Sequence, residues 1–216
     1  MLKNILFDLD GTLTDSQEGV INCFRYATQE LTQNQPTEAQ IKPLIGIPIR
    51  SIFRQLLDSE DGDLINEAVN IYRRKFSESG VFQNTVYAGI PELLAELRQD
   101  SYKICIVTLK NQTDAEIIAK HFSFDTLVDG IYGPDLDFYP ENKAELIKSA
   151  LEQGAFVPGE TVMIGDRKED IISGKANGVL TIGVTYGYGS NAELADSAPD
   201  RICNDPSEIK QAIKAL

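Results

Sequence analysis

Apolar residues follow two different spacings along the chain, and the change between them divides the sequence. In residues 16–82 they recur every three or four positions, which is the spacing of one buried helix face. The repeat is clearest in two sets: Val20, Phe24, Ala27 and Leu31, and then Ile65, Ala68, Val69, Tyr72 and Phe76. Ser16 is a candidate N-cap for the first helix, and Thr37 with Gln40 has the spacing of a capping box. We expect this block to be entirely helical.

Outside that block, short apolar runs alternate with helical patterns. Such runs cover residues 5–7, 102–108, 126–133, 161–166 and 179–187, with helical segments between the later ones. This alternation favours a parallel sheet with crossover helices. The first run therefore belongs with the later strands. The sequence predicts an α/β fold with a Rossmann-like, doubly wound parallel sheet built from residues 1–15 and 83–216, and an inserted all-helical domain over residues 16–82.

Composition limits the classes of partner. The 216 residues carry a net charge of −13 and no basic run, which argues against binding to nucleic acid or to an anionic membrane. The sequence shows neither a signal-peptide pattern nor an apolar stretch approaching the roughly 20 residues that span a bilayer. We expect a cytoplasmic monomer or small homo-oligomer. Cys23, Cys105 and Cys203 lie far apart, which favours buried free thiols over a disulfide or a zinc site.

Acidic and hydroxyl side chains stand where predicted strands end. Asp8, Thr108 and Asp166 each follow an apolar run, and the carboxyl ends of parallel strands form the ligand crevice of such sheets. The pair Asp10-Gly11 alone would indicate only a turn. If the strand continued, however, Asp10 would lie on the same side as Asp8, because side-chain direction repeats every two residues. Asp8 could then attack a phosphoryl group, while Asp10 served as general acid and base.

The remaining candidate residues would bind a metal ion or offset the negative charge of a bound phosphoryl group. Magnesium prefers oxygen ligands, which Asp8 and Asp166 can supply. Thr108 and Lys143, with the backbone around Leu109 and Lys110 at a helix start, could hold phosphoryl oxygens. Arg50, in the segment GIPIRSIF of the helical block, could meet a substrate anion.

The sequence resembles the haloacid dehalogenase superfamily across essentially the whole chain. The resemblance is carried by four features taken together: FDLDGT, IVTLKN, Lys143 and MIGDRKED. Within this superfamily the sequence is similar to phosphatases with a helical cap after the first strand, a group that includes phosphoglycolate phosphatases. The resemblance implies a Mg²⁺-dependent phosphatase that hydrolyses a small phosphorylated metabolite through an aspartyl-phosphate. It also implies that the backbone carbonyl of Asp10 is a third metal ligand, and that Asp170 orients Lys143 or a metal-bound water. The segment YPENKAEL departs from the family, because the lysine-proline loop often found there is absent.

Several alternatives remain open. A nucleotidase or a sugar phosphatase would carry the same core motifs. A phosphomutase of the β-phosphoglucomutase type is disfavoured, because those relatives commonly have valine where this chain has Thr12, and a cap histidine where it has Val20. A phosphonate hydrolase is disfavoured because its relatives replace the Asp10 acid. A non-catalytic regulator that binds a phosphorylated metabolite is a different class, which a turnover assay with p-nitrophenyl phosphate would separate.

Overall fold

A computed structural model describes residues 1–33, 35–135, 140 and 142–216. The chain divides into two compact units, one formed by Met1–Asp15 with Val86–Leu216 and the other by Ser16–Thr85. Among the described residues, no helix is both long and apolar enough to cross a membrane.

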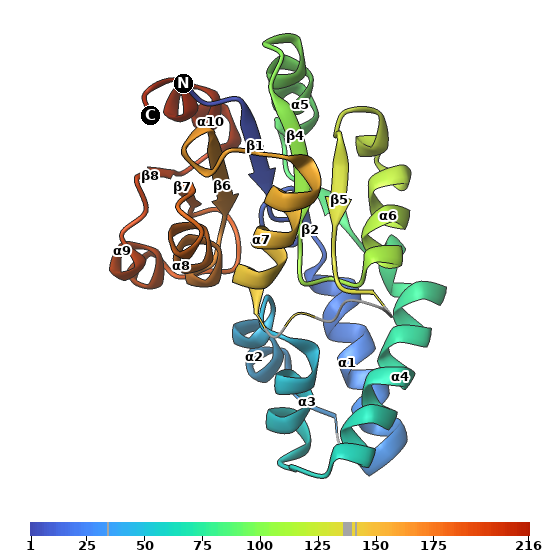
Figure 1. Cartoon of the computed structure of the whole chain (residues 1–216). Coiled ribbons are helices and arrows are strands. Elements are labelled where there is room, and N and C mark those ends of the chain that lie inside the picture. Colours follow the sequence, from blue (N-terminus) through green and yellow to red (C-terminus); the bar gives the residue numbers. More distant parts are fainter. Residues whose placement is uncertain (34, 136–139, 141) are drawn as a thin grey trace. The chain divides into compact units, whose positions relative to one another are not determined.

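The first unit is built on a parallel sheet (Figure 1), in which the described strands follow the order β5-β4-β1-β6-β7-β8. Their bounds are β1 (Asn4–Phe7), β4 (Lys103–Val107), β5 (Gly130–Tyr132), β6 (Thr161–Gly165), β7 (Leu180–Val184) and β8 (Arg201–Cys203). β1 pairs with β4 on one side and with β6 on the other, so Leu6 lies opposite both Cys105 and Met163. The chain runs outward from β1 to β5 and then returns to β6, which places the switch in strand order beside β1.

Helices cover the sheet on both faces. They are α5 (Ile90–Gln99), α6 (Gln112–His121), α7 (Lys143–Gly154), α8 (Lys168–Ala176), α9 (Asn191–Ser197) and α10 (Pro206–Lys214), with single 3₁₀ turns at η3 (Phe124–Thr126) and η4 (Pro158–Glu160). α7 packs on α8, and α5 packs on α10. In the view of Figure 1, α7 lies in front of the sheet and α5 behind it. The unit is thus the doubly wound α/β sheet that the alternating pattern predicts.

One apolar layer fills the space between α7 and the sheet. Its strand residues are Leu6, Cys105, Val107 and Met163, and its α7 residues are Leu146, Ile147, Ala150 and Leu151, all of them buried. Ile5 and Phe7 are also fully buried, on the opposite face, because alternate strand residues point to opposite sides. The three cysteines are buried free thiols, as predicted.

The second unit is a helical assembly. Its elements are α1 (Gln17–Thr32), α2 (Glu38–Ile41), η1 (Lys42–Leu44), α3 (Ile49–Leu57), α4 (Gly62–Glu78) and η2 (Gly80–Phe82). Phe24 of α1 packs against Phe53 of α3 and Tyr72 of α4, with ring centroids 5.1 and 4.5 Å away. The capping box of Thr37 and Gln40 is present, whereas Ser16 begins α1 without a side-chain capping bond.

Two very short strands mark the chain crossings between the units. β2 (Thr14–Asp15) and β3 (Thr85–Val86) pair with each other in a separate sheet. The sequence analysis did not predict them, because two residues are too few to show an alternating pattern.

The α7 layer gives a stability prediction. Ile147 is fully buried, whereas Ile172 on α8 is 55% exposed. Ile147→Ala should lower the free energy of unfolding by about 2–5 kcal/mol, because a cavity remains beneath α7. Ile172→Ala, the matched control, should change it by only about 0.5 kcal/mol. Urea denaturation measures both values, and similar losses for the two variants would contradict this packing.

Candidate active site

A tight turn, and not an extended strand, carries Asp10. β1 ends at Phe7, and the amides of Leu13 and Thr14 both donate to the carbonyl oxygen of Leu9, at 2.9 and 3.0 Å. The expectation that Asp8 and Asp10 share one face of a strand is therefore wrong. Gly11 allows this turn, since its φ is +90° and a Cβ there would stand 2.4 Å from Asp166 Oδ2.

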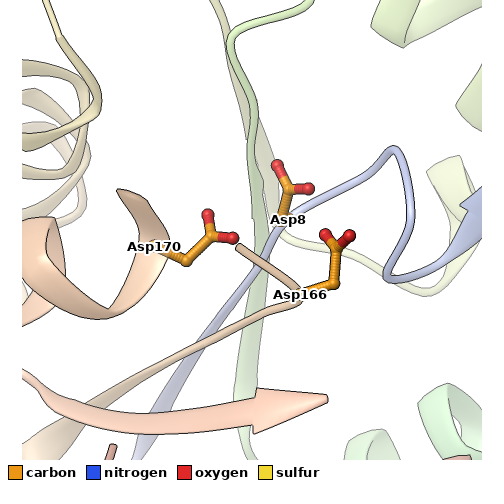
Figure 2. A group of neighbouring side chains, drawn as sticks. All are labelled: Asp8, Asp166 and Asp170. Carbon is orange, nitrogen blue, oxygen red and sulfur yellow. The ribbon is translucent and has the colours of Figure 1, made fainter. Parts of the chain in front are cut away.

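Three carboxylates from separate elements meet beside the switch point. Asp8 follows β1, Asp166 follows β6, and Asp170 lies in the first turn of α8. Figure 2 shows the three side chains gathered together, and one oxygen from each lies within 4.8 Å of the others. They are 7, 0 and 1% exposed, so water does little to screen their mutual repulsion.

Lys143, the first residue of α7, partly neutralises this cluster. Its buried ammonium contacts Asp8 and lies 2.5 Å from Asp170 Oδ1. Three carboxylates and one ammonium leave an excess of negative charge when all are ionised. The donors are hard oxygen atoms at the spacing of a shared ion, which fits a divalent cation such as Mg²⁺.

The pKa values of the cluster reflect this crowding. Burial raises the pKa of Asp8 well above its usual value, although the Lys143 ammonium opposes the shift. Burial, together with the charge of Asp170, raises the pKa of Asp166 to about 7. For Lys143, burial lowers the pKa, but the charges of Asp170 and Asp8 outweigh it and raise the pKa overall. Without a cation, Asp8 and Asp166 therefore hold their protons at higher pH than solvated carboxyl groups do.

Two donors fix the carboxylate of Asp166. The hydroxyl of Thr12 donates to Oδ1 at 3.3 Å, and the backbone amide of Tyr188 donates to Oδ2 at 2.6 Å. The sequence analysis assigned neither residue to the site. The glycine-rich segment TYGYGS could have indicated this contact, because it follows β7 and therefore begins at the same carboxyl edge of the sheet as Asp166.

Asp170 links Lys143 to the start of α8. Its Oδ2 accepts from the amide of Arg167 at 3.0 Å, and the guanidinium of Arg167 donates to Glu193 of α9 at 2.8 Å. Asp170 follows Asp166 by four residues, but α8 begins only at Lys168, so the two residues are not one turn apart on a single helix. Asp166 lies before the helix and Asp170 within it.

The segment after β4 contributes a second ion pair. Thr108 is 2% exposed, and its hydroxyl accepts from the amide of Lys110 at 3.1 Å. The ammonium of Lys110 lies 3.0 Å from Asp10 Oδ2, a pairing that the sequence analysis missed. The side chain of Leu109 is partly buried and packs against the apolar layer under α7.

Arg50, the remaining predicted residue, belongs to the helical unit. It lies in the first turn of α3, and its guanidinium donates to Asn66 Oδ1 of α4 at 2.5 Å.

Comparison with known proteins identifies the family. A family described as haloacid dehalogenase-like hydrolase matches residues 5–184. The chain belongs to this family. The resemblance that the motifs predicted is therefore confirmed.

Several relatives of this haloacid dehalogenase-like hydrolase have names that denote removal of phosphate. A protein of Pseudomonas aeruginosa named 5'-nucleotidase is 38% identical over 98% of this chain and 96% of its own. A phosphoglycolate phosphatase of Photobacterium profundum is 31% identical over 99% and 96%. The crystal structure of a predicted phosphatase from Clostridium acetobutylicum matches with a TM-score of 0.94 at 33% identity, covering 100% of both chains. The chain is thus an enzyme of the phosphatase type.

The raised pKa of Asp166 gives a pH prediction for the metal-free protein. Its pKa of about 7 exceeds the unfolded value of about 3.8, so the folded state binds more protons between these values. The stability that this proton contributes is present at low pH and is lost as pH rises through about 7. Asp166→Asn should therefore stabilise the protein more at about pH 8 than at about pH 5.

Urea denaturation in the presence of a chelator measures this difference. Asp196→Asn, on the exposed surface of α9, controls for loss of a charge outside the cluster. An equal effect of Asp166→Asn at both pH values would contradict the assignment.

Proposed function

We propose that this chain hydrolyses a small phosphomonoester through an aspartyl-phosphate formed on Asp8, with Mg²⁺ as cofactor. The observation that carries the proposal is the buried cluster of Asp8, Asp166 and Asp170 with Lys143 against it. A carboxylate can attack a phosphoryl group when nearby positive charge offsets the repulsion between the two anions. Asp8 lies where Lys143 supplies part of that charge.

The positions of the acids support a division of roles among them. Asp8 and Asp166 follow the neighbouring strands β1 and β6, and they would hold the metal together with the backbone carbonyl of Asp10. Asp170 faces Lys143 and the amide of Arg167, so it would orient Lys143. A bound Mg²⁺ would neutralise charge on the substrate phosphate and help to orient it.

The remaining residues of the site would transfer protons and bind the phosphoryl group. Asp8 attacks phosphorus, and Asp10 donates a proton to the leaving oxygen and later takes one from the attacking water. Lys110, whose ammonium lies 3.0 Å from Asp10 Oδ2, would hold the Asp10 carboxylate in its ionised form, which is the form that takes a proton from the attacking water. Thr108 and Lys143 hold phosphoryl oxygens, helped by the backbone amides that precede α6.

The helical unit would supply substrate specificity. We propose that residues 16–82, predicted from the apolar spacing, act as a cap, for which the compact unit Ser16–Thr85 offers a structural basis. Arg50 is the proposed contact to a substrate anion. We further propose that the enzyme acts in the cytoplasm, as a monomer or small homo-oligomer, on free phosphorylated metabolites and not on nucleic acid or membranes.

Two classes of phosphomonoester are the leading candidates for the substrate. The core motifs favour phosphoglycolate by their resemblance to phosphoglycolate phosphatases. The relative named 5'-nucleotidase, with 38% identity, favours a nucleoside 5'-monophosphate as the second candidate. Sugar phosphates form a third class with the same reacting group.

Phosphate release from a panel of these three classes tests the proposal. With Mg²⁺ present, at least one class should be hydrolysed, and the ranking by kcat/KM identifies the substrate. Chelation should abolish turnover and added Mg²⁺ should restore it, because Asp8 and the substrate phosphate repel each other without the ion. Full turnover in chelator would contradict the metal assignment, and no turnover of any ester would contradict the proposed function.

A second experiment separates Asp10 from Asp8. General acid–base assistance is worth about 10²- to 10⁴-fold, and an alkyl ester needs the proton more than p-nitrophenyl phosphate does. In Asp10→Asn, phosphorylation of Asp8 should slow more with the alkyl ester, while hydrolysis of the phosphoenzyme slows equally for both. Rapid-quench kinetics resolves the two steps. Equal slowing of phosphorylation with both esters would remove Asp10 from proton transfer.

A further inference from the structure

The loop between β7 and α9, residues 185–190, lies directly against Asp166. The amide of Tyr188 donates to Asp166 Oδ2 at 2.6 Å. A Cβ at Gly187 would stand 2.4 Å from the Cβ of Asp166, and one at Gly189 would stand 1.9 Å from the Asp166 carbonyl oxygen. Both positions therefore require glycine, because the loop backbone approaches Asp166 too closely for a side chain.

The tyrosines of this loop also reach the chain segments that adjoin the helical unit. The hydroxyl of Tyr188 donates to Asp15 Oδ1 at 3.0 Å, and the hydroxyl of Tyr186 donates to the carbonyl oxygen of Thr12 at 3.0 Å. The ring of Tyr186 packs edge-on against Tyr87, with centroids 4.9 Å apart. Asp15 is the last residue of the α/β unit before the chain leaves it, and Tyr87 follows β3 on its return. These contacts all lie within the α/β unit.

We propose that Tyr188 is a positioning residue that couples the orientation of the Asp166 carboxylate to the position of β2 at Asp15. Its amide donates a hydrogen bond to the Asp166 carboxylate and its hydroxyl donates one to Asp15. A displacement of Asp15 would therefore also displace the amide that orients Asp166. The inference rests on the proposed function, in which Asp166 binds Mg²⁺. It goes beyond that function by giving the metal site a connection to the segment that leads to the helical unit.

The coupling has a reciprocal consequence. If Mg²⁺ binding at Asp166 orders the segment around Asp15, then loosening that segment must weaken Mg²⁺ binding by the same free energy. Hydrogen-bond partners of metal ligands are typically worth 10- to 100-fold in metal affinity. The hydroxyl of Tyr188 acts one step further from the metal than its amide, so we expect an effect at the lower end, about tenfold.

Calorimetric Mg²⁺ titration of the metal-free protein, without substrate, measures the coupling. Tyr188→Phe removes the hydroxyl and keeps the amide, and Asp15→Ala removes the acceptor. Each should raise the Kd for Mg²⁺ about tenfold, and the double variant should be no weaker than either one, because both remove the same hydrogen bond. Asp15→Asn keeps an acceptor oxygen and should restore wild-type affinity. Tyr102 lies just before the amino end of β4, whereas Asp166 follows the carboxyl end of β6. Tyr102→Phe is therefore the matched control and should leave the Kd for Mg²⁺ unchanged.

Hydrogen exchange of residues 12–16 and 86–88 provides the second readout. Mg²⁺ should slow exchange there in the wild type and in Tyr102→Phe, but not in Tyr188→Phe. A wild type that binds Mg²⁺ and releases phosphate, beside a Tyr188→Phe variant with unchanged Kd and unchanged protection, would overturn this inference alone. A folded wild type with neither Mg²⁺ binding nor phosphate release would overturn the proposed function, and this inference with it.

Discussion

Burial of three carboxylates around a single ammonium is the constraint on which the site depends. Taking charges out of water is costly unless they are paired, and removing one partner of such a group leaves an uncompensated charge. Lys143 contacts two of the three acids, which raises its own pKa and limits the upward shift at Asp8. The protein thus holds a region of excess negative charge that protons or a divalent cation can stabilise.

The sheet topology explains why these groups meet. Because the strand order reverses beside β1, Asp8 emerges between the ends of β4 and β6, which carry Thr108 and Asp166. Lys143 and Asp170 come from the first turns of α7 and α8, which pack against each other over the sheet. Asp8 and Asp166 thus follow directly on strands, while Lys143 and Asp170 lie in first turns of helices, so regular elements above a packed apolar layer support all four side chains.

Much of this arrangement could be predicted from the sequence, for a physical reason. Apolar runs that end in Asp8, Thr108 and Asp166 mark buried parallel strands, and the ends of such strands share one edge. The α/β fold and the family followed from the same pattern and the motifs beside it. The placement of Asp10 could not be predicted in this way, because β1 ends at Phe7 and Gly11 permits a turn where the pattern alone would continue the strand.

Other features leave no periodic signal. β2 and β3 have two residues each, and α9 has only seven, so none of them was predicted. The amide of Tyr188 bonds Asp166 through its backbone, which side-chain chemistry does not reveal. The pairing of Lys110 with Asp10 depends on the path of the turn after β1, which the local sequence does not specify.

The central claim is that Asp8 becomes phosphorylated during turnover. Acid-quenching the enzyme with a substrate labelled in its phosphoryl group, followed by mass spectrometry of its peptides, tests this most directly. The account predicts an acid-stable phosphoryl group on Asp8 that forms before free phosphate and is absent from Asp8→Asn. Label on another residue, or full turnover by Asp8→Asn, would contradict it.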